Sequence, residues 1–198
     1  VHCPEAAVAG VERFVAAAAA LEERSYDYRL VAMAPGARVE PRRDFAVEAF
    51  ATEHPVPSLG YHLIRRKRRL APELEGRAAE EIAELRAAGA EVTAEVEEPV
   101  LSYCGDTGPG VFEREPRLFD VPLLMIETTY VGERHRDRAR DYGHTHLDDL
   151  AALERRFRNE TIVLHHLSRR HRPSELRREV DERLPRLAAR IHVWGVDT

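Results

Sequence analysis

Three apolar runs in this sequence end abruptly in a carboxylate or an imidazole, and this feature does most to limit the folds open to the chain. The runs and the polar residues that end or follow them are 99–104 with Asp106, 121–127 with Glu127, and 161–165 with His166. Short apolar runs bounded by turn residues are typical of buried strands. Strand ends on a rigid sheet can present side chains toward one edge, so we expect a cluster of metal ligands there.

The rest of the sequence alternates between patterns typical of strands and of helices. Strands are predicted at residues 28–34, 44–51, 60–64, 92–96, 99–104, 121–127 and 161–165. Helices are predicted at residues 11–23, 72–88, 146–157 and 175–191. This alternation indicates a layered α/β protein.

Length and composition limit the class of protein further. The 198 residues suffice for one domain, which we expect to span residues 1–198. No apolar run approaches the ~20 residues that span a bilayer, and the two cysteines are too few for a disulfide framework. We therefore expect a soluble, cytoplasmic protein without a membrane partner.

The charge is unevenly distributed. A net charge of −5 argues against nucleic-acid binding by the whole surface. Two basic runs can nevertheless attract phosphates, one at residues 169–172 and one formed by Arg65, Arg66, Lys67, Arg68 and Arg69.

Taken singly, the polar residues at the strand ends have ordinary structural explanations. A lone histidine such as His54 or His166 after a strand is usually a hydrogen-bonded structural residue, and Asp106 beside a glycine is a good turn residue. We predict that His62 is a surface or helix residue, and that His165 points away from the face used by His166 if the chain there is extended.

Taken together and in order, these segments resemble a known family. The segments are Glu53-His54-Pro55 with Gly60-Tyr61, Gly105-Asp106-Thr107, Glu127-Thr128-Thr129-Tyr130, Gly143-His144-Thr145-His146, and His165-His166-Leu167-Ser168-Arg169. Their order and spacing are similar to those of the metallo-β-lactamase superfamily, and most of all to ribonuclease Z, the tRNA 3′-processing endonuclease. The resemblance implies the second half of an αββα sandwich and runs from about residue 1 to residue 170.

The resemblance also implies roles for five residues. His54 and His166 would each bind one of two zinc ions, and Asp106 would bridge the two. His144 would donate a proton to the leaving group, and Glu127 would orient His144. Two metals can activate a shared water and neutralise charge on a phosphodiester.

One defining motif of the family, the His-x-His-x-Asp-His ligand cluster, does not occur in this sequence. Without it each zinc would have one terminal ligand and the bridging aspartate, fewer than the roughly three protein ligands of a catalytic zinc. Either the chain is a piece of a longer or split enzyme, as its start at Val1 suggests, or it is a homologue that has lost its metals. This chain alone is not expected to hold both ions.

Three functions follow as expectations. The first is a zinc-dependent endonuclease that cleaves precursor tRNA at the 3′ side. The second is a phosphodiesterase of the same fold acting on small or cyclic diesters, and the third is a non-catalytic binding or assembly subunit. The resemblance suggests a homodimer and places a tRNA-gripping arm at residues 65–69, although the short insert there predicts no long arm.

Overall fold

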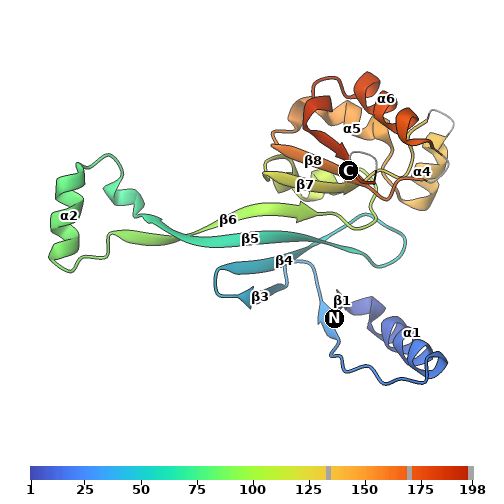
Figure 1. The fold of residues 1–198 in the computed structure, drawn as a ribbon, viewed down its shortest axis with the longest axis horizontal. Coiled ribbons are helices and arrows are strands. Elements are labelled where there is room, and N and C mark those ends of the chain that lie inside the picture. The colour runs from blue at the N-terminus through green and yellow to red at the C-terminus, as the bar shows by residue number, and fades with distance from the viewer. Residues whose placement is uncertain (133–134, 169–170, 196–198) are drawn as a thin grey trace.

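The main feature of the computed structural model, which describes residues 1–132, 135–168 and 171–195, is a seven-stranded sheet (Figure 1). Its strands, in spatial order, are β3 (Arg38–Arg42), β4 (Phe45–Ala51), β5 (Leu59–Leu70), β6 (Thr93–Tyr103), β7 (Leu123–Glu127), β8 (Thr161–His165) and β9 (Ile191–Val193). Spatial order follows chain order throughout the sheet.

The direction of the strands determines which of their ends meet. Strands β4 and β6 both pair antiparallel with β5, which lies between them. Strands β6, β7, β8 and β9 are parallel to one another. Therefore β4, β6, β7 and β8 all run the same way, and their carboxyl ends lie at one edge of the sheet.

The main hydrophobic core joins this sheet to helices α3 (Val111–Arg114), α5 (Leu147–Leu153) and α6 (Pro173–Arg183), and one further helix, α4 (Arg136–Tyr142), lies beside them. Figure 1 shows α4, α5 and α6 gathered beside β7 and β8. Leu124 and Ile126 of β7 are fully buried in one cluster with Ile162 of β8 and Leu150 of α5. Each such side chain contributes ~1.5–3 kcal/mol by leaving water, so the core holds β7 and β8 rigidly.

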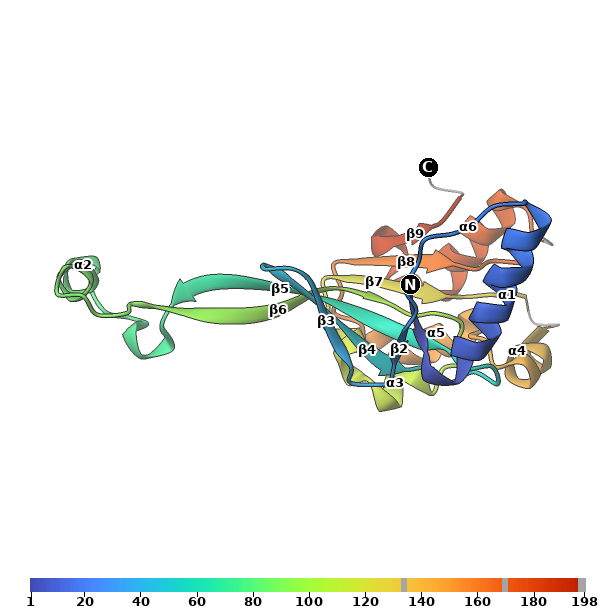
Figure 2. The same ribbon diagram turned by 90° about the horizontal axis from the view of Figure 1, so that it is seen from below.

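Strands β5 and β6 extend far beyond the rest of the sheet and form an arm. They contain 12 and 11 residues and pair from Tyr61 with Tyr103 out to Leu70 with Thr93. Helix α2 (Ala79–Ala87) lies at the far end of the arm, as Figure 1 and Figure 2 show. The prediction of no long arm was therefore wrong, because the charged residues at 65–69 continue the strand instead of ending it.

A small unit precedes the large sheet. Strands β1 (His2–Pro4) and β2 (Val31–Met33) form a two-stranded parallel sheet, and helix α1 (Val8–Leu21) joins them. No residue of α1 is buried, and Phe14 is 74% exposed. Figure 1 shows α1 away from the seven-stranded sheet. No helix within the described parts of the chain is long and apolar enough to cross a membrane.

Most predicted elements occur in the structure, and several differ in extent, among them the strand predicted at 60–64, which is β5 (Leu59–Leu70), and the helix predicted at 146–157, which is α5 (Leu147–Leu153). The predicted strands at 92–96 and 99–104 are the single strand β6, whose pairing with β5 shifts register between Leu63 and Ile64. The predicted helix at 72–88 is helical only from Ala79, apart from a short turn at Pro72–Leu74. The predicted helix at 175–191 ends at Arg183. The predicted strand at 28–34 is reduced to Val31–Met33.

Candidate active site

The carboxyl ends of four strands bring the predicted site residues together. Asp106 follows β6, Glu127 ends β7 and His166 follows β8, while His54 lies three residues beyond the end of β4. His144 comes from the loop between α4 and α5. Its ring centre lies 5.3 Å from that of His54 and 5.3 Å from that of His166.

Possible metal-ligand atoms in this cluster are close to one another. The ligand atoms of His54, Asp106 and His144 lie within 4.8 Å of one another, and the same holds for Glu127, His144 and His166. Asp106 Oδ1 is 3.5 Å from His166 Nδ1. All five predicted residues therefore form one site.

Glu127 is the buried centre of this site. Its carboxylate is fully buried, and Oε1 accepts a hydrogen bond from His144 Nδ1 at 2.7 Å. The backbone N–H of Thr107 and that of Thr145 also donate to Oε1, at 3.1 and 3.2 Å. A buried carboxylate is stable only when such donors satisfy it, so this network fixes the position of the His144 ring.

Glu53 joins the loop that carries His54 to the loop that carries Asp106. The Glu53 backbone N–H donates to Thr107 Oγ1 at 2.9 Å, and the Glu53 carboxylate accepts from the Gly110 N–H at 2.7 Å. A Cβ atom at Gly110 would lie 2.4 Å from Glu53 Oε2, so only glycine permits this approach.

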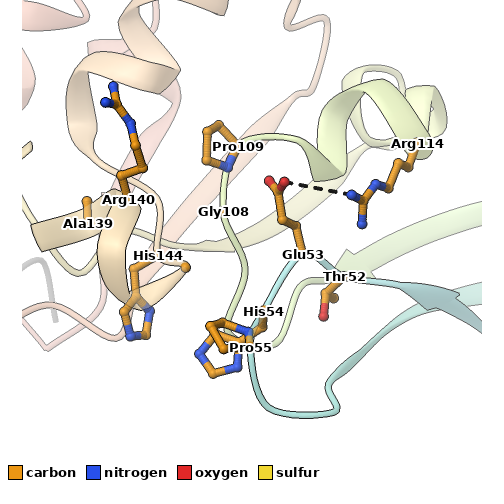
Figure 3. Close-up of a pocket in the computed structure, with 11 residues that line it drawn as sticks. Thr52, Glu53, His54, Pro55, Gly108, Pro109, Arg114, Ala139, Arg140 and His144 are labelled. Atoms are coloured by element: carbon orange, nitrogen blue, oxygen red, sulfur yellow. Dashed lines mark ion pairs between the residues drawn. The ribbon is translucent and has the colours of Figure 1, made fainter. Parts of the chain in front are cut away.

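A second glycine lets the His144 loop pack against the His54 loop. Gly143 ends helix α4 with φ of 70°, a conformation that suits glycine. A Cβ atom at Gly143 would lie 2.4 Å from Pro55 Cδ. Figure 3 shows His54 and His144 side by side at this junction.

Thr129 connects Glu127 to His166. Its hydroxyl donates to Glu127 Oε2 at 2.9 Å and lies 2.8 Å from His166 Nδ1. His166 has φ of 58°, in the left-handed region that few non-glycine residues adopt. Such strain is often found at functional sites.

The donor atoms fit zinc in type but not in number. His144 and His166 are held through Nδ1 by Glu127 and Thr129, while His54 Nδ1 accepts from the Val56 N–H at 3.2 Å and lies 3.1 Å from Val56 O. No residue in the described part of the chain hydrogen bonds to their Nε2 atoms, which is the arrangement of metal-binding histidines with an outer partner. His54, Asp106 and His166 still fall short of the roughly three protein ligands per catalytic zinc.

The basic run from Arg65 to Arg69 lies on the arm, away from this cluster. All five side chains are paired with glutamates. Arg65, Lys67 and Arg69 contact Glu98, Arg66 contacts Glu40 and Glu97, and Arg68 contacts Glu91. Arg169 and Arg170 of the second basic run lie outside the described residues.

Two neighbouring histidines are also placed by the structure. His165 contacts Cys104 O through Nε2 at 3.1 Å and stacks on Tyr103, so it lies apart from the contacts of His166. The prediction that His62 is a surface or helix residue was wrong, because it lies on strand β5 and in the interior, at 0% exposure. There Ser102 Oγ lies 2.6 Å from His62 Nδ1.

Glu53 and Thr129 are site residues that we did not single out from the sequence. The contacts of Glu53 join two loops that are more than 50 residues apart in the sequence, and those of Thr129 join the ends of neighbouring strands. No local sequence pattern reveals such contacts. Their positions directly beside His54 and within the Glu127 segment were the available signal.

Known ribonuclease Z proteins are similar to this chain in sequence. It is 30% identical over 174 residues to tRNase Z TRZ1 of Arabidopsis thaliana, covering 86% of this chain and 62% of that protein. It is 26% identical over 195 residues to ribonuclease Z of Staphylococcus aureus strain MSSA476, covering 84% of this chain and 60% of that protein. The chain thus spans less than two thirds of these relatives. No protein-family model matches it.

Solved structures share the fold. The metallo-β-lactamase fold protein YhfI of Bacillus subtilis aligns with a TM-score of 0.53 and 14% identity, covering 87% of this chain and 56% of that chain. The chain therefore has the metallo-β-lactamase fold, with the residue cluster at the carboxyl ends of its strands. In sequence the chain is ribonuclease Z-like, because the relatives named above are tRNase Z and ribonuclease Z proteins.

Proposed function

We propose that this chain carries the proton donor and three of the metal ligands of a ribonuclease Z-type endonuclease, and that the whole protein cleaves precursor tRNA at the 3′ side. The observation that carries the proposal is the meeting of four strand ends around the pair formed by His144 and Glu127. The named relatives support the substrate, because they are tRNase Z and ribonuclease Z proteins. We also propose that residues 1–198 form a single domain.

The proposed metal ligands are His54 for one zinc, His166 for the other and Asp106 for both. Bound zinc would lower the pKa of a water molecule and neutralise charge on the phosphodiester. Thr129 holds the His166 ring through Nδ1 at 2.8 Å, and the Val56 backbone holds the His54 ring through Nδ1, with N at 3.2 Å and O at 3.1 Å. A complete pair of zinc sites needs ligands beyond these three residues.

His144 is the proposed proton donor. Its Nδ1–H donates to Glu127, which leaves Nε2 to carry the proton that the departing oxygen receives. Glu127 is the positioning residue, because its other acceptor sites are occupied by backbone N–H groups and Thr129. His144 is held by this network even though its side chain is 14% exposed and reachable by substrate.

The arm and the subunit interface are parts of the same proposal. Arginines and lysines contact RNA phosphates without reading the sequence, so we assign Arg65 to Arg69 to the RNA, with their glutamate pairs weakening each contact. We also propose a homodimer, which light scattering on the purified full-length protein tests directly.

Cleavage assays on the full-length protein test the proposed function. A precursor tRNA and the small diester bis(p-nitrophenyl) phosphate are compared, with zinc content measured on the same sample. Cleavage of the tRNA at one 3′ position with steep salt dependence supports the proposal. Cleavage of the small diester alone would indicate a small-diester phosphodiesterase. Less than one zinc per chain that added zinc does not raise, with no cleavage, would indicate a non-catalytic subunit.

A further inference from the structure

A cavity of about 500 Å³ opens beside His54 and His144. Its other lining residues include Arg114 of α3, Arg140 of α4 and Pro109 of the loop after β6. Figure 3 shows the two histidines together at one end and the two arginines toward the other, on either side of Pro109. A cavity of this size accommodates a ligand as large as a nucleoside.

The charge lining this cavity is positive. Arg114 and Arg140 oppose the single carboxylate of Glu53. That carboxylate already accepts a hydrogen bond from the Gly110 N–H at 2.7 Å and lies 3.7 Å from Arg114. Arg140 is exposed and has no acidic partner within the described part of the chain, so its guanidinium is available to an anion.

The backbone fixes the position of Arg140 relative to His144. The N–H of Gly143 donates to Arg140 O at 3.2 Å, and the N–H of His144 donates to Ala139 O at 2.8 Å. The two residues therefore belong to one rigid turn at the end of α4. A phosphate bound by Arg140 would therefore lie at a fixed position relative to the phosphodiester bond that is cleaved beside His144.

A second cavity of about 500 Å³ also borders Arg140 and His144, but its charge is different. Its lining includes Asp148 and Asp149, of which Asp148 pairs with Arg136. The two carboxylates there balance the two arginines, so the second cavity does not favour a phosphate. The first cavity is the better site for the backbone of a nucleic acid.

We propose that Arg140 binds the phosphate next to the one that is cleaved, and that the first cavity holds the nucleoside between the two phosphates. The apolar faces of Pro55 and Pro109 contact that nucleoside. This inference rests on the proposed function and adds a specific subsite to it. It makes Arg140 a substrate-binding residue that acts on affinity for RNA and not on proton transfer.

Binding of a modified precursor tRNA to the full-length protein tests the inference. A methylphosphonate at the scissile position, with a 2′-deoxyribose on its 5′ side so that no 2′-hydroxyl can attack it, removes that charge, and the Kd is measured on samples in which the RNA is recovered intact. Arg140→Ala is expected to raise the Kd about tenfold, because the neighbouring phosphate would lose its charge-assisted hydrogen bond. It should also reduce the slope of log Kd against log salt by about one. Arg140→Lys should retain most of the affinity.

The matched control is Arg138→Ala. Arg138 lies on the same helix and is exposed, but it lies over the Tyr142 ring at 5.9 Å and lines neither cavity. Its replacement should leave the Kd unchanged. An equal loss in Arg138→Ala and Arg140→Ala would overturn the inference, because it would show only a general effect of positive charge.

A second methylphosphonate, at the neighbouring phosphate, identifies the contact. If Arg140 binds that phosphate, neutralising it should remove the difference in Kd between the native protein and Arg140→Ala. If the difference in Kd between the native protein and Arg140→Ala persists whichever phosphate carries the methylphosphonate, the assignment is contradicted. Cleavage of unmodified precursor tRNA by the native protein separates this result from the proposed function. Absence of that cleavage would refute the proposed enzyme, whereas the Kd comparison alone decides the subsite.

Discussion

Glu127 Oε1 accepts a hydrogen bond of 2.7 Å from His144 Nδ1, although the two residues lie on different elements and are 17 positions apart. The other oxygen, Oε2, accepts from the N–H and the hydroxyl of Thr129, at 3.0 and 2.9 Å. Every group around this buried carboxylate is therefore placed to donate. Only a side chain that accepts hydrogen bonds at both terminal atoms, as an ionised carboxylate does, satisfies these donors.

Glu127→Gln tests the role of this pair. The amide brings an NH₂ group against donors, so we expect a loss of ~1–3 kcal/mol in the free energy of unfolding, measured with urea. We expect kcat on precursor tRNA to fall by about 10²-fold, since general acid catalysis contributes roughly 10²–10⁴-fold. Zinc content should stay unchanged, and His144→Ala should show the same pattern without loss of metal. Metal loss equal to the loss of activity would instead make these residues ligands.

The cluster around Asp106 gives a prediction about metal binding. Asp106→Ala in the full-length protein is expected to abolish zinc binding and cleavage, because one carboxylate is proposed to serve both ions. His54→Ala and His166→Ala should each lower zinc content and activity. The measurement is metal analysis after dialysis together with tRNA cleavage. Full zinc content in Asp106→Ala would rule out the bridging role.

The sequence correctly predicted the strands whose ends meet at the site edge of the sheet, because those strands are buried. The runs that end at Glu127 and His165 are apolar because both strands are buried in the core, and burial leaves a strong local pattern. The parallel direction of those strands then places their ends together.

Other features were not predictable from local patterns. The basic run from Arg65 to Arg69 resembles a solvent-exposed loop, but Glu98 on the facing strand compensates its charge and allows a long hairpin. His62 is buried because β6 supplies Ser102 as its partner, 40 positions away. Such pairings are visible only once the strands are aligned.

Glu115 gives a prediction about acid stability. Burial would raise the pKa of its carboxyl, but His62 and Arg117 outweigh this effect and lower the pKa to about 2. Between the ordinary pKa of ~4.5 and about 2, the unfolded chain binds more protons, so stability should fall as the pH decreases through this window. Glu115→Gln should weaken that dependence, measured by urea unfolding from pH 5 to pH 2.5.

The control for this prediction is Glu113→Gln. Glu113 is exposed on α3 and forms no ion pair with the described residues, so its replacement should leave the pH dependence of unfolding unchanged. The same slope in the native protein and in Glu115→Gln would show that this carboxyl does not couple folding to pH.

On one face of the arm, a single carboxylate contacts three basic side chains. Glu98 lies 2.5 Å from Arg69 and 3.9 Å from Arg65, and it also contacts Lys67. Because β5 alternates faces, Arg66 points the other way and pairs with Glu97 at 2.8 Å. The two glutamates therefore neutralise opposite faces of the arm.

Glu98→Gln removes the negative charge from the face that carries Arg65, Lys67 and Arg69. If these cations contact tRNA, this variant should bind precursor tRNA more tightly, and the slope of log Kd against log salt should steepen by about 0.9 for one added effective charge. Glu97→Gln changes the other face and shows whether one face binds the RNA. Binding is measured by fluorescence anisotropy at several salt concentrations. An unchanged Kd and slope in both variants would mean that the ion pairs stabilise the hairpin and that the arm does not use these charges to hold RNA.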